Sequence, residues 1–594
     1  MNKRVQTEGE LTQQVLDILL CLKHERFSNQ RLLAEKTGMS LGFVNKAVSI
    51  LEEAGLIDKE CLPTAKARSL FQRCKPQRAV ILAAGFSWKL GPINSTTSAA
   101  LLEIRGEILI ERQIEQLHEA GITDISIVVG FMKERFDYLV DKYGVRLLYN
   151  DSYAVKNNIY SVSLASAELS NCYLIPSDIW SENNPYRSDE LYSWYMVSDG
   201  YDAESSVRVN RKNELILVAP GEGGNRMIGI AYLLDRDADI VRANIKDLLS
   251  DGKHNGSYWE EALYDGDRMT VHARLSPDGD HKEITTFEQY QDVDLGSTRL
   301  KDESVRTIMD AFGCSVSDIT DVSVLKKGMT NRSFLFTVKG TKYILRVPGE
   351  GTDHIINRKQ EAAVFKAIRG TGLCDDPVFI DAESGYKITR YLEGIRVCDT
   401  GSEDDLKKCM DKLRSFHEMK LKVDHEFDIF EKICSYESLW NGMPSIFRDY
   451  NETKEKIMSL RDVIKKIEKD KCLTHIDAVS DNFLFFKPDG SAEECLQLTD
   501  WEYAGMQDPH VDIAMFCIYS LFDKERCDHL IDIYFNNKCD TVTRGKIYCY
   551  IASCGLLWSN WCEYKRQLGV EFGEYSVRQY RYAKEFFKYA GEIL

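Results

Sequence analysis

The stretch His475-Ile-Asp477-Ala-Val-Ser-Asp-Asn482 is followed, eighteen residues on, by Asp500-Trp-Glu-Tyr503. Together they carry the polar groups that phosphoryl transfer from ATP needs: a carboxylate for the proton of the acceptor hydroxyl, and oxygen ligands for magnesium. The order and spacing predict that Asp477 is the catalytic base and that Asn482 and Asp500 bind Mg2+. The alternative is a polar loop between two buried strands, because apolar residues flank both segments.

A glycine-bearing turn lies between two strand-like stretches farther upstream. There Gly328, Thr330 and Asn331 would let backbone amides approach the phosphates of ATP. The next strand carries a single cation, Arg346, and the helix-like segment after it carries Glu361. We expect these two residues to form an ion pair that positions the nucleotide. All five are therefore predicted to belong to an ATP-binding site.

These segments together resemble the bacterial choline kinase branch of the aminoglycoside phosphotransferase and choline kinase family. The segments that carry the resemblance are Gly328–Asn331, Leu345–Gly349, His475–Asn482 and Asp500–Gly505. The resemblance covers about residues 300–594. It implies an α+β, two-lobed, protein-kinase-like fold that uses ATP and Mg2+ and phosphorylates choline or a related amino alcohol. Arg346 stands where the family has lysine, which keeps the charge and changes its reach and geometry.

Choline members of this family hold the quaternary ammonium in a box of aromatic rings, because a fixed cation is attracted to ring faces. The resemblance therefore implies a choline pocket, with Glu502 as a counter-charge. Its candidate rings are Trp501, Tyr503, Trp558, Trp561 and Tyr564. Packing in the core is an equal alternative for Trp558 and Trp561, whose i, i+3 spacing also suits a buried helix face.

The middle third begins with an apolar strand that runs into a turn, Ala79-Val-Ile-Leu-Ala-Ala-Gly85. This pattern is typical of a doubly wound sheet that binds a nucleotide. The region resembles the sugar-phosphate nucleotidyltransferase family, in particular its CTP:phosphocholine cytidylyltransferase branch. Further segments that match in order are Ile110–Ile114, Val128–Phe131, Tyr149–Asp151, Asn157–Ser161 and Tyr173–Asp178. The resemblance covers about residues 77–295 and implies an α/β, Rossmann-like nucleotidyltransferase fold.

The nucleotidyltransferase pattern is damaged at several positions. Where the family has Gly-x-Gly-x-Arg, this chain has Gly85-Phe-Ser-Trp-Lys89, so a glycine that permits close backbone approach is lost. Where the family has Pro-Lys, it has Ser98-Ala99, which removes a catalytic cation. Asp178 matches the first metal ligand. The second carboxylate falls near residues 284–286, which contain no Asp, although Glu283 or Glu288 would restore it after a small shift of register.

Two interpretations of this middle domain remain. An active enzyme, using CTP, would need Lys89 to replace two lost contacts. A pseudoenzyme would need only the fold and a phosphocholine pocket at Asn157, Asn158 and Tyr160, and we favour this interpretation because the loss of a transition-state cation costs several kcal/mol. A simple turn is an equal alternative for the two asparagines.

The first 75 residues have the pattern of a winged helix-turn-helix domain. Residues 11–22 have helical apolar spacing, Ser28 starts a second helix, and a turn at residues 38–40 precedes a third. Ser40, Asn45 and Lys46 are predicted to face outward on that third helix. Twelve Lys and Arg against nine Asp and Glu give this segment a charge of +3, which is compatible with binding to DNA. Dimerisation or an interdomain role is an equal alternative.

Composition and net charge limit the classes of partner that the chain can bind. The chain has 594 residues, 44% of them hydrophobic, and a net charge of -17, which excludes broad binding of nucleic acid or anionic membrane outside the first segment. The absence of a signal peptide and of a bilayer-spanning apolar run predicts a cytoplasmic location. We expect three domains, at residues 1–75, 76–296 and 297–594. The sequence gives no indication of oligomeric state.

These observations leave three hypotheses for the function. The favoured hypothesis is a choline-type kinase fused to an impaired nucleotidyltransferase domain and a winged helix. The second is a bifunctional enzyme that makes phosphocholine and then CDP-choline. The third is a transcriptional regulator that senses choline metabolites.

Overall fold

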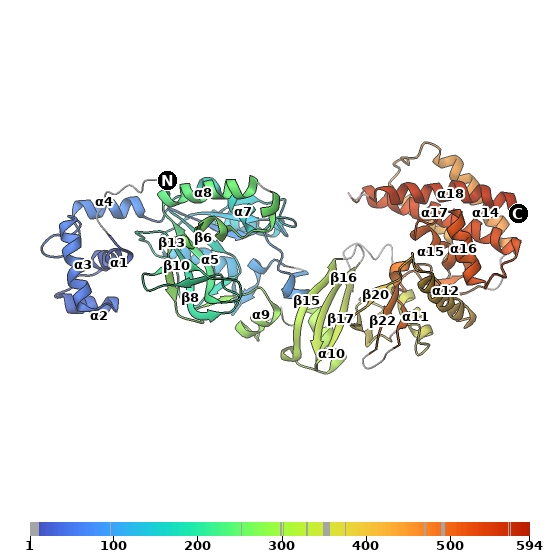
Figure 1. Cartoon of the computed structure of the whole chain (residues 1–594), viewed down its shortest axis with the longest axis horizontal. Helices are drawn as coiled ribbons and strands as arrows, with labels where there is room; N and C mark the ends of the chain where they lie inside the picture. Colours follow the sequence, from blue (N-terminus) through green and yellow to red (C-terminus); the bar gives the residue numbers. More distant parts are fainter. Residues whose placement is uncertain are drawn as a thin grey trace. The chain divides into compact units, whose positions relative to one another are not determined.

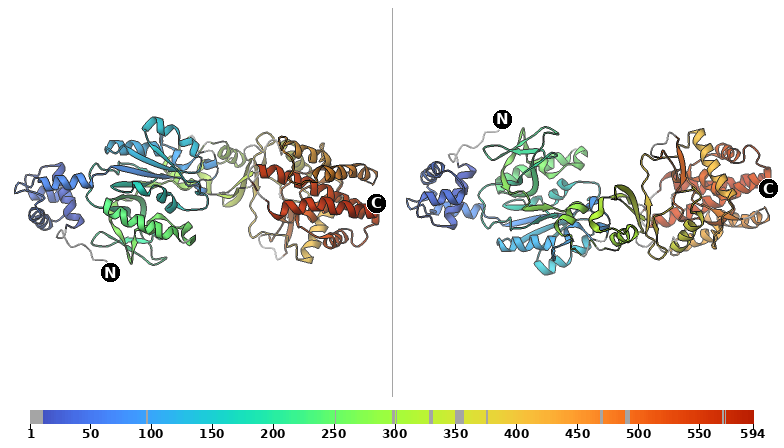
Figure 2. Two further views of the ribbon diagram at one scale, coloured as in Figure 1. Left: turned by 90° about the horizontal axis from the view of Figure 1, so that it is seen from above. Right: turned by 90° about the horizontal axis from the view of Figure 1, so that it is seen from below.

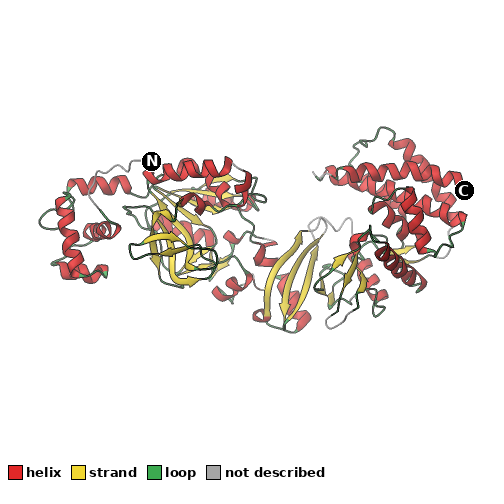
Figure 3. Cartoon of the chain, in the orientation of Figure 1, coloured by secondary structure: helices red, strands yellow, loops and turns green. Residues whose placement is uncertain are grey.

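The computed structural model describes most of the chain. The described residues are 11–95, 97–250, 252–297, 300, 302–327, 331–348, 357–374, 376–467, 471–488, 493–567, 570 and 572–594. The chain forms two compact units: Met1–Arg306 with Ile319–Val324, and Thr307–Asp318 with Leu325–Leu594. Figure 1 labels their elements, and Figure 3 distinguishes helices from strands.

The first unit begins with a small helical domain. Its helices are α1 (Gln13–His24), α2 (Gln30–Thr37), α3 (Leu41–Glu53) and α4 (Ala65–Cys74). The cap of α2 is Asn29, one residue later than predicted, and it accepts hydrogen bonds from two backbone amides. A bridge between Ile57 and Pro63 forms a short wing between α3 and α4. As predicted, Asn45 and Lys46 are exposed on α3.

A mixed sheet forms the centre of the rest of this unit, in the order β5-β4-β1-β6-β11-β8-β13-β10-β9, with β12 paired to β13. Strands β5, β4, β1 and β6 are parallel to their neighbours, and β11 joins β6 antiparallel. The strands are β1 (Arg78–Ala83), β4 (Asp124–Val129), β5 (Arg146–Tyr149), β6 (Cys172–Pro176), β8 (Trp194–Asp202), β9 (Val207–Val209), β10 (Glu214–Leu217), β11 (Gly224–Leu233), β12 (Tyr264–Asp265) and β13 (Arg268–Ser276). The parallel part is the doubly wound arrangement that the first apolar strand predicts.

Helices cover both faces of this sheet, as Figure 2 shows for the blue segment around residues 110–140 and for the green α8 on the opposite side. The helices are α5 (Leu109–Glu119), α6 (Tyr138–Tyr143), α7 (Asn158–Leu164), α8 (Asp235–Ser250) and α9 (Phe287–Val293). Two small ribbons complete the unit: β2 (Glu103–Ile104) with β3 (Glu107–Ile108), and β7 (Ile179–Ser181) with β14 (His281–Glu283).

The second unit has a smaller lobe with the antiparallel strand order β15-β16-β17-β19-β18. Its elements are α10 (Glu303–Phe312), β15 (Ile319–Lys327), β16 (Asn331–Val338), β17 (Thr341–Pro348), α11 (Arg358–Ile368), β18 (Phe379–Ile380) and β19 (Lys387–Arg390). In this register Arg346 of β17 lies opposite Lys387 of β19.

A larger, mostly helical lobe follows. Its helices are α12 (Glu403–Glu418), α13 (Ile429–Ser438), α14 (Tyr450–Ile467), α15 (His510–Tyr519), α16 (Lys524–Tyr534), α17 (Thr541–Gln567) and α18 (Glu574–Ile593). Its short strands are β20 (Arg396–Val397), β21 (Cys472–Thr474), β22 (Phe483–Phe486), β23 (Cys495–Leu498) and β24 (Gly505–Gln507). Helix α17 is buried nearly all round, which explains its lack of an amphipathic pattern. Within the described residues, none of the helices combines the length and the apolar character that crossing a bilayer requires.

Candidate active site

The catalytic loop connects β21 to β22, and the buried carboxylate of Asp512 on α15 fixes its first residues. Asp512 accepts hydrogen bonds from the backbone amides of His475 at 3.0 Å and Ile476 at 2.7 Å. The His417 ring of α12 lies 2.9 Å from the same carboxylate. Ile476 has φ of +69°, a conformation that a β-branched residue adopts only when its surroundings impose it. Neither Asp512 nor His417 was predicted from the sequence.

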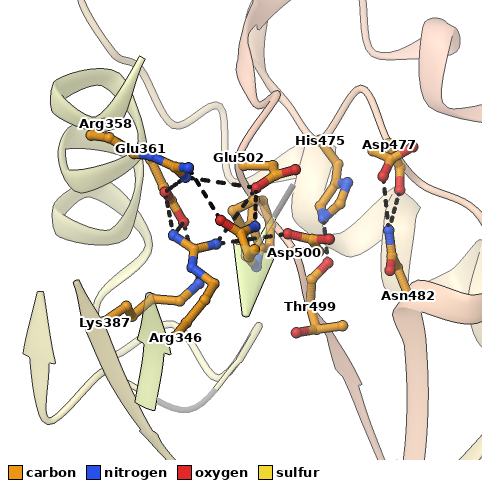
Figure 4. Close-up of polar contacts among 12 residues, drawn as sticks. Arg346, Arg358, Glu361, Lys387, His475, Asp477, Asn482, Thr499, Asp500 and Glu502 are labelled. Atoms are coloured by element: carbon orange, nitrogen blue, oxygen red, sulfur yellow. Dashed lines mark hydrogen bonds and ion pairs between the residues drawn. The ribbon is translucent and has the colours of Figure 1, made fainter. Parts of the chain in front are cut away.

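Asp477 and Asn482 lie together, as predicted, and Figure 4 shows their contact. The Asn482 Nδ2 donates to the backbone oxygen of Asp477 at 2.8 Å and to its Oδ2 at 3.2 Å. Burial raises the pKa of Asp477 to about 8, and the negative charges of Asp500 and Glu502 add to this effect. The site therefore has more negative charge than its own cations neutralise, which suits a position that binds metal ions.

Asp500 lies on the loop after β23, and its side chain is 43% exposed. Its φ of +65° is uncommon for a residue other than glycine and is typical of strained functional loops. The His475 Nε2 lies 2.9 Å from the backbone oxygen of Thr499 and so links this loop to the catalytic loop. The Thr499 amide also donates to the backbone oxygen of Asn482 at 2.9 Å, so hydrogen bonds hold the loops of the two predicted magnesium ligands, Asn482 and Asp500, in register.

The smaller lobe contributes a buried cluster of charges around Glu361. Arg346 forms the predicted ion pair with both oxygens of Glu361. Two cations that the sequence did not reveal join it: Lys387 at 3.2 Å and Arg358 at 3.4 Å. Burial alone would raise the pKa of Glu361, but Lys387 and Arg346 outweigh it and lower the pKa to about 2. Glu361 is therefore ionised at neutral pH and holds Arg346 in place.

Asn331 connects this cluster to the loop of Asp500. It donates to the Glu502 carboxylate at 2.9 Å and accepts from Arg358 at 3.1 Å. The Arg346 Nη1 lies 3.6 Å from the same Glu502 oxygen. Glu502 is thus held by the smaller lobe, although burial and the charge of Asp500 raise its pKa to about 7. Its role as the counter-charge of choline stays a prediction. Gly328 and Thr330 lie outside the described residues.

All three predicted tryptophans are buried in the core, Trp558 at 7% and Trp561 at 8% exposure, but Trp558 and Trp561 also contact other predicted rings in one connected group. Trp501 is 0% exposed, and its indole donates to the backbone oxygen of Leu498 at 2.9 Å. It packs the core, so its prediction as a pocket residue is wrong. The ring of Trp558 lies 5.9 Å from that of Tyr503 and 5.5 Å from that of Trp561.

The group continues beyond the predicted rings. Phe572 lies 5.0 Å from Trp561, and Tyr575 lies 6.5 Å from Phe572. The negative charge of Asp477 contributes to the raised pKa of Tyr575, after burial and the thiol of Cys562, which indicates that the group reaches toward the catalytic carboxylate. Phe572 and Tyr575 were missed because their spacing forms no apolar pattern with the rings of α17. None of the described ring contacts brings Tyr564 into this group.

The site of the middle domain keeps a pair of carboxylates. Asp178 follows β6, and its backbone oxygen accepts from the Ile284 amide at 2.8 Å. Glu283 ends the strand that pairs with β7. Burial and, to a smaller extent, the charge of Glu283 raise the pKa of Asp178 to about 7. The register therefore brings Glu283 to Asp178, whereas Glu288 accepts from the Val322 amide at 3.2 Å.

The remaining predicted residues of this domain have mainly structural contacts. Asn157 caps α7 and donates to the backbone oxygen of Gly256 at 3.0 Å. Asn158 accepts from the Trp259 amide at 2.8 Å. These contacts favour the turn interpretation of both asparagines.

The Lys156 ammonium lies 4.0 Å from the centre of the Tyr160 ring. Lys89 contributes to lowering the pKa of Glu283, against burial, which raises it. A side chain at Gly85 would meet open space.

Three family models match the chain. Residues 322–544 match choline/ethanolamine kinase, residues 79–179 match the MobA-like NTP transferase domain, and residues 11–58 match winged helix-turn-helix DNA-binding. They confirm the three predicted resemblances, the multidomain fold and the kinase-type phosphotransferase domain. The kinase and nucleotidyltransferase matches also confirm nucleotides as co-substrates.

Relatives and solved structures match the same regions. The choline-phosphate cytidylyltransferase of Streptococcus pneumoniae is 36% identical over 32% of this chain and 83% of its own length. Protein LicA of Haemophilus influenzae is 29% identical over 42% of this chain and 76% of its own. The crystal structure of choline kinase LicA from Streptococcus pneumoniae is 28% identical, covers 48% of this chain and 98% of its own, and has a TM-score of 0.41.

Replacing Glu361 with Gln should leave buried cations without a counter-charge and destabilise the kinase domain by about 3 kcal/mol. The folded pKa near 2 lies below the ordinary 4.5, so the contribution of Glu361 is complete above pH ~4.5 and is lost as the pH falls toward 2. Calorimetric melting of the full chain at several pH values measures both effects, and the KM for ATP should rise.

The matched control is Glu393→Gln, which removes an exposed carboxylate that pairs with Lys342 of the same sheet at 2.7 Å. It should change neither the thermal stability of the kinase domain nor the KM for ATP. Equal melting of the Glu361→Gln variant and the wild type would show that Glu361 does not organise this lobe.

Proposed function

The chain belongs to the choline-phosphate cytidylyltransferase family through its middle domain and carries a choline/ethanolamine kinase domain, and on this premise we propose that its main activity is ATP-dependent phosphorylation of choline to phosphocholine. The observation that carries the proposal is the position of Asp477. Its half-buried carboxylate lies beside Asn482 and within the negative field of Asp500 and Glu502. Such a group is suited to accept the proton of a substrate hydroxyl once cations favour its ionised form.

Each part of the site has a role in this reaction. Asn482 and Asp500 hold Mg2+, which supplies charge neutralisation on the phosphates when it is bound. Arg346, fixed by Glu361, turns Nη1 toward Asp500 and Glu502; this atom is buried and has no hydrogen-bond partner among the described residues. We assign it to a phosphate oxygen of ATP. Such a contact would satisfy the buried donor.

The aromatic group around Trp558 is the proposed site for the ammonium of the substrate. Tyr503, Trp558, Trp561 and Phe572 form a continuous chain of ring contacts. Cation–π attraction suits a quaternary ammonium, which has no proton to donate. The negative charges of Glu502, Asp477 and Asp500 all reach Tyr503, and that of Asp477 also reaches Tyr575.

Replacing Asp477 with Asn should lower kcat for phosphocholine formation by about 10²- to 10⁴-fold, because the amide cannot accept the hydroxyl proton. The matched control is Asp481→Asn in the same loop, whose side chain accepts from the Tyr519 hydroxyl at 2.7 Å. It should keep kcat within a few-fold. Mass spectrometry of phosphocholine formed from ATP, Mg2+ and choline measures both rates. Retention of wild-type kcat by the Asp477→Asn variant would refute the proposal.

For the middle domain we propose an impaired cytidylyltransferase. The second candidate is a bifunctional enzyme, and the observation in its favour is the pair Asp178 and Glu283, which supplies two carboxylates for a metal ion. The observation against it is Ala99, which is buried and uncharged where the family has lysine. Arg226 and Lys89 both lie near enough to Glu283 to oppose the rise of its pKa that burial causes, but neither stands at the position where the family has the lost lysine.

With CTP and phosphocholine, CDP-choline should form at least about 10²-fold more slowly than phosphocholine forms in the kinase reaction, because one lost transition-state donor costs about 3 kcal/mol or more. The same purified chain supplies both rates by mass spectrometry. Asp178→Asn identifies any product that comes from this domain. Comparable rates that this substitution abolishes would establish the bifunctional enzyme instead.

We also propose that the N-terminal domain contacts DNA through α3. Support comes from Asn45 and Lys46, which are exposed on that helix, and from Ser40, which caps it. This role is compatible with the kinase and does not require the chain to be a transcriptional regulator alone.

A further inference from the structure

A cavity of about 780 Å3 lies between the winged-helix domain and the nucleotidyltransferase sheet, both of which belong to one compact unit. Helix α1 is attached to the sheet domain beside it. Gln13 Nε2 donates to the Tyr192 hydroxyl at 3.2 Å and to the backbone oxygen of Ala273 at 3.1 Å. Apolar residues of the two domains also form one continuous core. The cavity is therefore part of a packed interface, which is a common place for small-molecule sites.

One end of the cavity offers hydrogen-bond acceptors. Gln13 is 8% exposed, and its Oε1 is buried without a hydrogen-bond partner among the described residues. Beside it, the Asp17 carboxylate accepts from the Tyr192 hydroxyl at 2.7 Å. Burial raises the pKa of Asp17. A buried acceptor without a donor is costly, so a ligand that brings a positive N–H group would stabilise this end.

Arg187, which also lines the cavity, supplies a positive charge that could bind an anionic group of the same ligand. Its side chain is exposed and forms no ion pair within the described part of the chain. Neighbouring cations are already neutralised: Arg274 by Glu190, and Lys23 by Asp189. Among these three cations, Arg187 is thus the one available to an anionic group, and a guanidinium suits a phosphate through paired hydrogen bonds.

We propose that this cavity binds a small zwitterion, a phosphorylated primary amino alcohol, with its protonated ammonium at Asp17 and Gln13 and its phosphate at Arg187. The choice of this class rests on the proposed function, because a kinase domain that phosphorylates amino alcohols would make such molecules. The cavity is also lined by Thr37, the last residue of α2, and by Met39, in the turn between α2 and α3. Occupation of the cavity would therefore fix the segment that leads into the outward-facing helix and couple product level to its position.

The test is hydrogen–deuterium exchange with mass spectrometry on the full chain, with phosphoethanolamine, phosphocholine or inorganic phosphate added separately at millimolar concentration. Phosphoethanolamine should slow exchange of amides in α1 and in residues 36–41 at least about threefold, whereas phosphocholine, which has no N–H to donate, and inorganic phosphate should not. Asp17→Asn and Arg187→Ala should each remove the protection. Arg187 is exposed, so its substitution leaves the buried interface intact. The control Glu35→Gln, on the exposed face of α2, should keep the protection.

Absence of protection with phosphoethanolamine, equal protection by phosphocholine or inorganic phosphate, or protection that persists in both variants would each overturn the proposal. The kinase assay on the same preparations separates the two ideas. Protection of the cavity without phosphocholine formation would contradict the proposed function and leave the cavity site standing.

Discussion

The kinase site depends on one buried carboxylate, that of Asp512. It accepts the amides of His475 and Ile476 and contacts the ring of His417, so it joins α15, α12 and the end of β21. These contacts hold Ile476 in a left-handed conformation and thereby set the direction in which the next residue, Asp477, leaves the chain. Because the carboxylate is fully buried, the loss of any one partner would leave a costly unpaired group. The loop is therefore held in one conformation before any substrate binds.

The second organising principle is the balance of charge around the loop. In the smaller lobe Arg346, Arg358 and Lys387 surround Glu361, and this cluster extends through Asn331 to Glu502. The carboxylates of Asp477 and Asp500 are not neutralised in the same way, and the pKa of Asp477 is raised in consequence. One side of the site is thus pre-organised by ion pairs, whereas the other requires cations. Magnesium and an ammonium substrate would supply them, which gives a physical reason for the order of polar residues in the sequence.

Local spacing was enough to predict contacts between residues on the same loop, such as Asp477 with Asn482, and the pair Arg346 with Glu361. It could not predict His417 or Lys387, because their roles arise only when distant helices and strands pack together. It misassigned Trp501, since spacing does not tell which face of a turn enters the core. It also left the register of Glu283 open until the pairing of β14 with β7 decided it. In the first domain the helical periodicity gave the right helices, but nothing in it indicated the cavity that forms against the sheet.

The pH dependence of phosphocholine formation tests the central claim most directly, namely that Asp477 is a base whose half-buried carboxylate takes up a proton until cations arrive. Without magnesium the pKa of Asp477 is near 8, and magnesium and the ammonium of the substrate lower it because they favour the ionised form. At saturating ATP and magnesium, kcat/KM for choline reports the enzyme with both bound, so it should rise with pH through a pKa below 8 and then level off. A kcat/KM that falls, or that does not change, as the pH rises from about 5 to about 8 would contradict the account.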